Sequence, residues 1–189
     1  MRSLAILSLL CWLVCFQATD IFTVGVARAK TLDGERQMIV ASAPLAAEAG
    51  RDILRAGGTA TDAAIAALLV LGLVEPQSAG IGGSAFLLHY SAKSKRVDAY
   101  DGRDAAPAAA AGRMFLGPDG ESLALSAAAI GGRAVGVPGL LRLAKLTHLD
   151  HGRLPWSALF APAISLAEQG FPVSQTLHRT IEAYSFLRD

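Results

Sequence analysis

The sequence predicts a mixed α/β fold, because segments with helical periodicity alternate with segments that have strand character. Three observations carry this prediction: apolar residues at helical spacing behind Pro44, an unbroken apolar run over residues 63–71, and two strand-like segments joined by a turn over residues 85–101. The 189 residues suit one domain or part of a larger one, and a hydrophobic content of 52% is enough to build a sizeable core.

The first elements follow from turn and cap residues. Residues 38–42 have the character of a short buried strand. A helix then begins at Pro44, whose fixed φ suits the first helical position, and Gly57-Gly58 ends it. Thr59 or Thr61 can cap the next helix, because a hydroxyl oxygen accepts from free backbone N–H groups. The apolar positions of the first helix are Leu45, Ala49, Ile53 and Ala56.

The apolar run over residues 63–71 predicts a helix that is buried on all sides. It is too short to span a bilayer, which needs about 20 residues. The hairpin prediction follows from two strand-like segments, residues 85–90 and 96–101, on either side of a turn at residues 92–95.

The second half of the chain is predicted to be mainly helical. A strand is expected over residues 133–137, and a helix runs from Pro138 to Gly152. Two further helical pieces meet at Pro162, and Ser174 caps the last helix. One side of the helix behind Pro138 carries Leu140, Leu141, Ala144 and His148.

The glycine-rich segment before the hairpin contains Gly80, Gly82 and Gly83. A phosphate-binding loop lies between a strand and the N-terminus of a helix, whose free N–H groups hold the phosphate. This loop follows a helix and precedes a strand, so its order argues against a nucleotide site. The glycines instead indicate a tight helix-to-strand crossing.

Residues 1–29 are predicted to be a secretory signal peptide. Met1-Arg2 is positively charged, residues 4–16 are almost continuously apolar, and Ala27-Arg28-Ala29 offers a cleavage site, although the cut could fall earlier. An uncleaved membrane anchor is the alternative, but the apolar run is short for a span. We therefore expect a mature protein that is secreted or periplasmic.

Cleavage after Ala29 changes the composition. Cys11 and Cys15, the only cysteines, leave with the signal, so the mature chain has no disulfide. Removing Arg2, Arg28 and Asp20 from 17 basic and 16 acidic residues leaves 15 of each. The neutral balance gives no reason to expect binding to nucleic acid or to anionic lipid.

Five segments in order resemble the γ-glutamyltransferase family, also called the glutathione hydrolases. The resemblance covers roughly residues 38–189, and the chain departs from the family pattern at Ser84-Ala85 and at Asp104. The segments are VASAPLAAEAGRDILRAGGTATDAAIAALLVLGLVEPQSAGIGGSAFLLHY, DAYDGRDAAPAA, Met114-Phe115-Leu116, GGRAVGVPGLL and GRLPWSALFAPAISLAEQGFPVS.

This resemblance implies the N-terminal-nucleophile hydrolase fold, a four-layer αββα sandwich. Residues 30–189 would be the N-terminal portion of the large-subunit domain, so the sandwich would be partial and truncated. The resemblance also implies that Gly80, Gly82 and Gly83 let the chain pass tightly against the central sheets near the substrate pocket.

The family's enzymes are precursors that cut themselves before a threonine, which becomes the nucleophile and uses its own α-amino group as base. They form an acyl-enzyme from γ-glutamyl amides such as glutathione, and water or an amino acid then takes the acyl group. The resemblance implies a small subunit from the same precursor as a partner, no metal or organic cofactor, and no membrane contact after signal removal.

The nucleophilic threonine is expected to lie beyond this chain. The family's nucleophile opens a Thr-Thr-His-type segment, and the nearest match, Thr147-His148, falls inside a predicted helix. We therefore expect no catalytic residue within the chain and no activity from the chain alone. Two other classes stay open: a non-catalytic binding or structural remnant of the fold, and a related cephalosporin or glutaryl amidase.

Arg103 is the one substrate-binding residue that the resemblance implies. It matches the arginine that holds the α-carboxylate of the γ-glutamyl group, and a planar guanidinium can meet a carboxylate through two parallel hydrogen bonds. The alternative is a salt bridge with Asp101 or Asp104, and Asp104 is a candidate to orient Arg103. No metal site is expected from the scattered histidines, which are His89, His148, His151 and His178.

Overall fold

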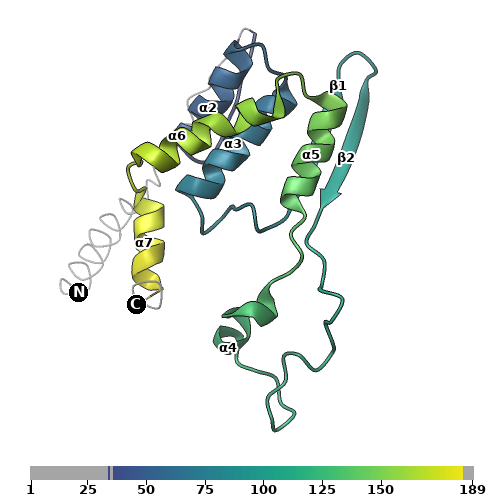
Figure 1. Ribbon diagram of the computed structural model, residues 1–189, viewed down its shortest axis with the longest axis vertical. Coiled ribbons are helices and arrows are strands. Elements are labelled where there is room, and N and C mark those ends of the chain that lie inside the picture. The colour runs from purple at the N-terminus through teal and green to yellow at the C-terminus, as the bar shows by residue number, and fades with distance from the viewer. Residues whose placement is uncertain (1–33, 35, 185–189) are drawn as a thin grey trace, which may run out of the picture. The chain divides into compact units, whose positions relative to one another are not determined.

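The computed structural model describes residue 34 and residues 36–184, so the predicted signal peptide, residues 1–29, lies outside the described residues. Within the described part, no helix is long and apolar enough to cross a membrane. The elements in chain order (Figure 1) are α2 (Pro44–Arg55), α3 (Ala60–Val74), β1 (Ala85–Ser91), β2 (Arg96–Gly102), α4 (Leu125–Ala129), η1 (Gly132–Ala134), α5 (Leu140–His151), η2 (Trp156–Phe160), α6 (Ala161–Gln169) and α7 (Gln175–Ala183).

The predicted helix ends are confirmed where a local signal marks them. Pro44 occupies the first turn of α2. Thr59 caps α3, because its hydroxyl accepts from the backbone N–H of Asp62 while the Asp62 carboxylate accepts from the N–H of Thr59. Ser174 caps α7 by accepting from the N–H of Leu177.

Helix α3 lies at the centre of the helical core, as its apolar sequence predicts. Within the run 63–71, only Ala64 is exposed. Helices α2, α5 and α6 and the short helix η2 pack around it. The buried side chains of the larger cluster are Ile53, Leu54, Ala63, Ile65, Ala66, Leu69, Ala144 and Leu159.

The carboxylate of Asp62 ties this core together at one end of α3. It is fully buried and its Oδ2 atom accepts from the backbone N–H groups of Thr59 (2.9 Å), Arg153 (3.0 Å) and Leu154 (3.2 Å). Burial acts to raise the pKa of Asp62, but these backbone donors stabilise its charged form and together lower the pKa below its ordinary value of 3.8. The loop after α5 is thereby fixed to the start of α3.

Strands β1 and β2 form the predicted antiparallel hairpin, in which Ala85 lies opposite Gly102 and Ser91 lies opposite Arg96. Helix α5 packs beside the hairpin, with contacts to both strands (Figure 1). Within the described residues, this two-stranded sheet is the whole sheet structure. The mixed fold class is confirmed, and the four-layer sandwich stays a prediction.

Three local predictions are wrong. Residues 38–42 are not a strand, because no described strand pairs with them, and Met38 and Val40 are 54% and 84% exposed. Residues 133–137 form no strand either, since η1 occupies their start and Val137 makes only an isolated bridge. In α5 the buried leucine beside Leu140 is Leu143, whereas Leu141 is 37% exposed.

We predict that Asp62→Asn lowers the free energy of unfolding by about 1.5–3 kcal/mol, because a neutral amide makes weaker hydrogen bonds to the three backbone donors. The folded-state pKa of Asp62 is depressed, so its stabilising effect is present above pH 3.8 and is lost as the pH falls through the folded-state value. Urea unfolding at several pH values should show the two proteins converging in acid.

The matched control is Asp52→Asn, which removes a carboxylate whose ion pairs with Arg51 and Arg55 are exposed. Its effect should stay below about 0.5 kcal/mol. Equal losses for the two variants would contradict the role given to Asp62.

Candidate functional site

Arg103 lies directly after the last residue of β2, where the chain crosses the start of α5. Gly102 is buried there, and a Cβ atom on Gly102 would lie 2.5 Å from Cβ of Leu143. A Cβ atom on Gly139, the N-cap of α5, would collide with the carbonyl oxygen of Gly102. Only glycine at both positions allows the two backbones to approach this closely.

A second backbone contact follows two residues later. The N–H of Ala105 donates to the carbonyl of Val137 (3.2 Å), and the N–H of Val137 donates to the carbonyl of Ala105 (2.8 Å). Arg103 therefore lies between two fixed points of the backbone, the Gly102–Gly139 crossing and this bridge. Side chains held on a rigid backbone can be aimed more accurately than side chains on a free loop.

The side chain of Arg103 is largely exposed, at 67%, and its Nε atom lies 3.2 Å from Oδ1 of Asp104. Its backbone N–H donates to the carboxylate of Asp101 (2.8 Å). The salt bridge that formed the alternative interpretation is therefore present. An exposed pair of this kind contributes only about 0–1 kcal/mol, so it does not prevent the guanidinium from meeting a second carboxylate.

Gly136 makes room for Asp104. A Cβ atom at Gly136 would lie 2.7 Å from Oδ2 of Asp104 and 3.3 Å from the carbonyl oxygen of Ala105. The segment before Pro138 and the acidic neighbour of Arg103 are thus packed against each other. The sequence singled out Arg103 but gave no role to Gly102, Gly136 or Gly139, because their contacts join segments more than 30 residues apart.

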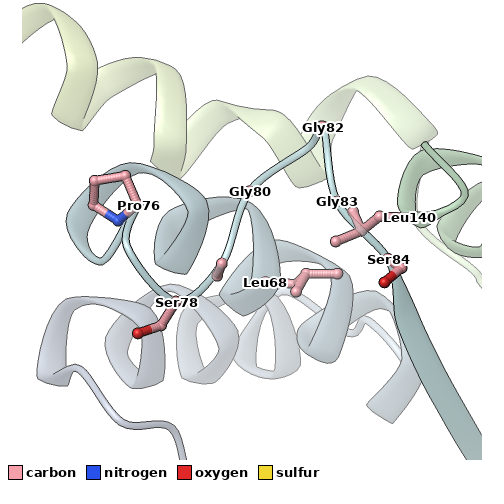
Figure 2. A pocket seen from close by; sticks show the side chains of 9 residues that line it. Leu68, Pro76, Ser78, Gly80, Gly82, Gly83, Ser84 and Leu140 are labelled. Atoms are coloured by element: carbon pink, nitrogen blue, oxygen red, sulfur yellow. The ribbon is translucent and has the colours of Figure 1, made fainter. Parts of the chain in front are cut away.

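The glycine loop, residues 80–83, also contacts the start of α5. The carbonyl of Gly83 accepts from the N–H groups of Gly139 and Leu140, both at 3.2 Å. Figure 2 shows the loop between Pro76 and Ser84, which lines an open pocket of about 500 Å³ together with Leu68 and Leu140. The residues that line this pocket are small or apolar, Ser78 and Ser84 are its polar members, and none of them carries a charge.

The passage of the glycine loop against the central sheets stays a prediction, because the described sheet consists of the hairpin alone. A Cβ atom at Gly80 or Gly82 would meet no described atom within 4 Å, and one at Gly83 would lie 3.3 Å from the carbonyl oxygen of Gly80. The backbone of Gly80 packs on α3, where a Cβ atom at Gly72 would lie 3.4 Å from Cα of Gly80, and a tighter backbone approach that requires glycine occurs at Gly102 and Gly139.

Two of the four histidines, which are scattered in the sequence, meet in the fold. His89 on β1 and His151 at the end of α5 are stacked, with ring centroids 3.6 Å apart and planes at 10°. Asp98 lies directly opposite His89 on β2. We call these three residues the His–Asp cluster. The hairpin register could have indicated the His89–Asp98 pair, but the position of His151 depends on how α5 packs.

Tyr100 borders the His–Asp cluster. Its hydroxyl donates to Oδ2 of Asp150 (2.9 Å) and lies 2.7 Å from Nε2 of His151. Burial, followed by the hydrogen bond to Asp150 and the charges of Asp150 and Asp98, raises the pKa of Tyr100 to about 12. The phenol therefore stays protonated and acts as a hydrogen-bonding group at neutral pH.

The opposite face of the hairpin is apolar and exposed. Phe86, Leu88 and Tyr90 alternate along β1 and are 67%, 74% and 61% exposed, and Val97, the cross-strand partner of Tyr90, is 59% exposed. We call these four residues the outer hairpin face. Contiguous exposed apolar surface of this kind is typical of an interface.

Comparison with known proteins shows which family this sequence matches. The sequence model of the family described as Gamma-glutamyltranspeptidase matches residues 46–188. The chain is 43% identical over 143 residues to Scoloptoxin SSD14 of Scolopendra dehaani, covering 76% of the chain and 24% of that protein. It is 39% identical over 151 residues to the glutathione hydrolase proenzyme of Bacillus subtilis (strain 168), and this match covers 80% of the chain and 26% of that protein.

Comparison with solved structures also finds members of this family and related enzymes. The gamma-glutamyltranspeptidase from Pseudomonas nitroreducens complexed with L-DON has a TM-score of 0.75 at 33% identity, covering 84% of this chain and 46% of that one. The cephalosporin acylase from Bacillus halodurans has a TM-score of 0.66 at 33% identity, covering 85% and 31%. The chain spans about a quarter of the length of the curated relatives it matches.

We predict that Gly139→Ala destabilises the chain by about 1–3 kcal/mol, because the added Cβ meets backbone that cannot turn away. Gly82→Ala is the matched control, since its Cβ would point into open space. Thermal unfolding followed by circular dichroism measures both. A Gly139→Ala protein as stable as the Gly82→Ala protein would show that the backbone crossing does not constrain the fold.

Proposed function

Because the chain belongs to the γ-glutamyltranspeptidase family, we propose that it supplies the carboxylate-binding part of an enzyme that transfers or hydrolyses γ-glutamyl groups. The substrates are γ-glutamyl amides such as glutathione. The observation that supports this most directly is Arg103, a largely exposed guanidinium at a strand end that is fixed by two backbone contacts.

In this proposal the guanidinium of Arg103 receives the α-carboxylate of the γ-glutamyl group through two parallel hydrogen bonds. Asp104, 3.2 Å from its Nε atom, orients the guanidinium. Binding the carboxylate at one end of the substrate sets where the γ-carbonyl lies, so the reacting carbon is presented in a fixed place. Arg103 is thus a substrate-binding residue and takes no part in proton transfer.

The nucleophile in this proposal is a threonine at the N-terminus of its subunit. It comes from a small subunit of the same precursor, and the relative from Bacillus subtilis is likewise named a proenzyme. The threonine oxygen bonds to the γ-carbonyl carbon, the C–N bond breaks, and the leaving amine takes the proton that the threonine α-amino group had accepted. Water or an amino acid then releases the glutamyl group.

The outer hairpin face supports a partner of this kind. We propose that a second β-sheet, supplied by the small subunit, packs on Phe86, Leu88, Tyr90 and Val97, since two sheets that stack face to face bury their apolar sides. The hairpin would then lie in the central layers of the sandwich, with α5 covering its other face.

A second candidate function is an amidase of the cephalosporin acylase type, which the structural likeness to the Bacillus halodurans acylase favours. A glutaryl group carries the same terminal carboxylate as a γ-glutamyl group but lacks the α-amino group. Comparing the hydrolysis of γ-glutamyl and glutaryl anilides therefore separates the two functions.

Our first prediction for this function concerns Arg103→Lys, which keeps the charge and loses the planar fork. It is measured in a chimera in which residues 38–189 replace the matching segment of the Bacillus subtilis enzyme. The kcat/KM for a γ-glutamyl anilide should fall about tenfold or more, the loss expected for one charge-assisted hydrogen bond. Arg113→Lys, on the neighbouring loop, is the control, and equal kinetics for both variants would remove Arg103 from the site.

The second concerns assembly. Leu88→Asp places a charge on the outer hairpin face, so association of this chain with the catalytic subunit should weaken at least tenfold, whereas the free chain should keep its stability because Leu88 is 74% exposed. Leu149→Asp, at a leucine of α5 that is 68% exposed, is the control. Undiminished association of the Leu88→Asp chain in a pull-down titration would exclude this face as the contact surface.

The third concerns export. We propose that the protein is secreted or periplasmic after removal of residues 1–29, as the apolar run and the Ala27-Arg28-Ala29 site predict. N-terminal sequencing of protein recovered outside the cytoplasm should begin at or near Lys30. Recovery of protein that still begins at Met1 would overturn the proposal.

A further inference from the structure

The His–Asp cluster brings three potential metal ligands together from three elements. His89 and Asp98 are direct cross-strand partners in the hairpin, and His151 is the last residue of α5, which packs on the same face. One ligand atom from each residue lies within 4.8 Å of the other two. All three side chains are half-buried, so water and ions can reach them.

The charges around the cluster favour a cation. Asp98 and Asp150 are both acidic. Among the described residues, Asp98 pairs with Arg96, whose side chain is 76% exposed and lies 3.7 Å away, and with His151 itself, whose Nε2 atom lies 3.9 Å from Oδ2 of Asp98. Two neutral imidazoles and one carboxylate form a donor set that suits Zn²⁺ and neighbouring divalent transition metals. Such a set leaves at least one coordination position for water.

The hydrogen bonds around the cluster also fit a metal site. Nε2 of His151 lies 2.7 Å from the Tyr100 hydroxyl, which donates to Asp150, and 3.9 Å from Oδ2 of Asp98, and in the tautomer that donates Nε2–H to the Tyr100 oxygen the ring keeps a lone pair on Nδ1. A second-shell acceptor of this kind is usual for metal-binding histidines, because it fixes the tautomer. On the other histidine, Nδ1 of His89 is buried and has no hydrogen-bond partner among the described residues.

We propose that His89, Asp98 and His151 bind one divalent transition-metal ion, with Zn²⁺ as the ion whose chemistry fits the donor set. The site joins the hairpin to the end of α5 and is independent of Arg103. It departs from the expectation that the chain has no metal site, which rested on the separation of the histidines in the sequence.

Binding requires the two rings to leave their stacked arrangement. The lone pairs of an imidazole lie in its ring plane, so two rings at 10° to each other direct them side by side instead of toward one point. Rotation of the His89 and His151 side chains brings the lone pairs to a common centre. The metal–ligand bonds replace the stacking contact, and the backbone of the hairpin and of α5 stays in place.

The test is a Zn²⁺ titration of the full chain against a chromogenic chelator, at a pH above the ordinary histidine pKa of about 6.5. Every protein carries Cys11→Ser and Cys15→Ser, so that no thiolate competes. We expect one Zn²⁺ per chain, and at least tenfold weaker binding for His89→Ala and for His151→Ala. Co²⁺ in place of Zn²⁺ should give visible absorption bands that these variants lack.

Two further variants keep the test decisive. Asp98→Asn preserves the shape of the side chain and should also weaken Zn²⁺ binding. If a histidine variant fails to fold, this variant still tests the metal site. His178→Ala removes an exposed histidine of α7 and should leave the affinity unchanged. Equal affinity across the parent, Asp98→Asn and His151→Ala would overturn the proposal, as would an equal loss in His178→Ala.

Discussion

The contact between the backbones of Gly102 and Gly139 is the constraint on which the arrangement of the hairpin and α5 depends. A side chain at either position would strike backbone or Leu143, so the end of β2 can cross the start of α5 only through glycine. Arg103 is the next residue after Gly102, and the Ala105–Val137 bridge fixes the chain two residues beyond Arg103. The exposed guanidinium therefore extends from a backbone that is held on both sides.

The helical core provides the support behind this crossing. Helix α5 is held at its start by the carbonyl of Gly83, and the loop after its end is held by the buried carboxylate of Asp62. Because both ends are fixed, α5 presents one face to α3 and another to the hairpin. The packing of α5 on the hairpin brings Gly139 against Gly102, next to Arg103, and brings His151 against His89. The proposed carboxylate site and the proposed metal site therefore both depend on this packing, although they have no residue in common.

Local signals in the sequence were sufficient for the longer helices and the hairpin, because caps such as Thr59 and Ser174 act within three residues of their partners. The short helices α4 and η1 carry no such signal and were not predicted. The strand expected at residues 38–42 failed because a strand needs a partner, which its own sequence does not reveal. The role of Arg103 came from resemblance to a family. Gly139 and the His–Asp cluster were missed because their contacts join distant segments, and tertiary packing decides which of those segments meet.

Arg103 is proposed to bind the α-carboxylate of a γ-glutamyl group. The most direct measurement is a crystal structure of residues 38–189 assembled in the Bacillus subtilis chimera with L-glutamate bound. We predict two parallel hydrogen bonds from the guanidinium of Arg103 to the α-carboxylate, with the backbone of Gly102 and Gly139 unchanged. A carboxylate held by other residues, with Arg103 still directed only at Asp104, would contradict the account.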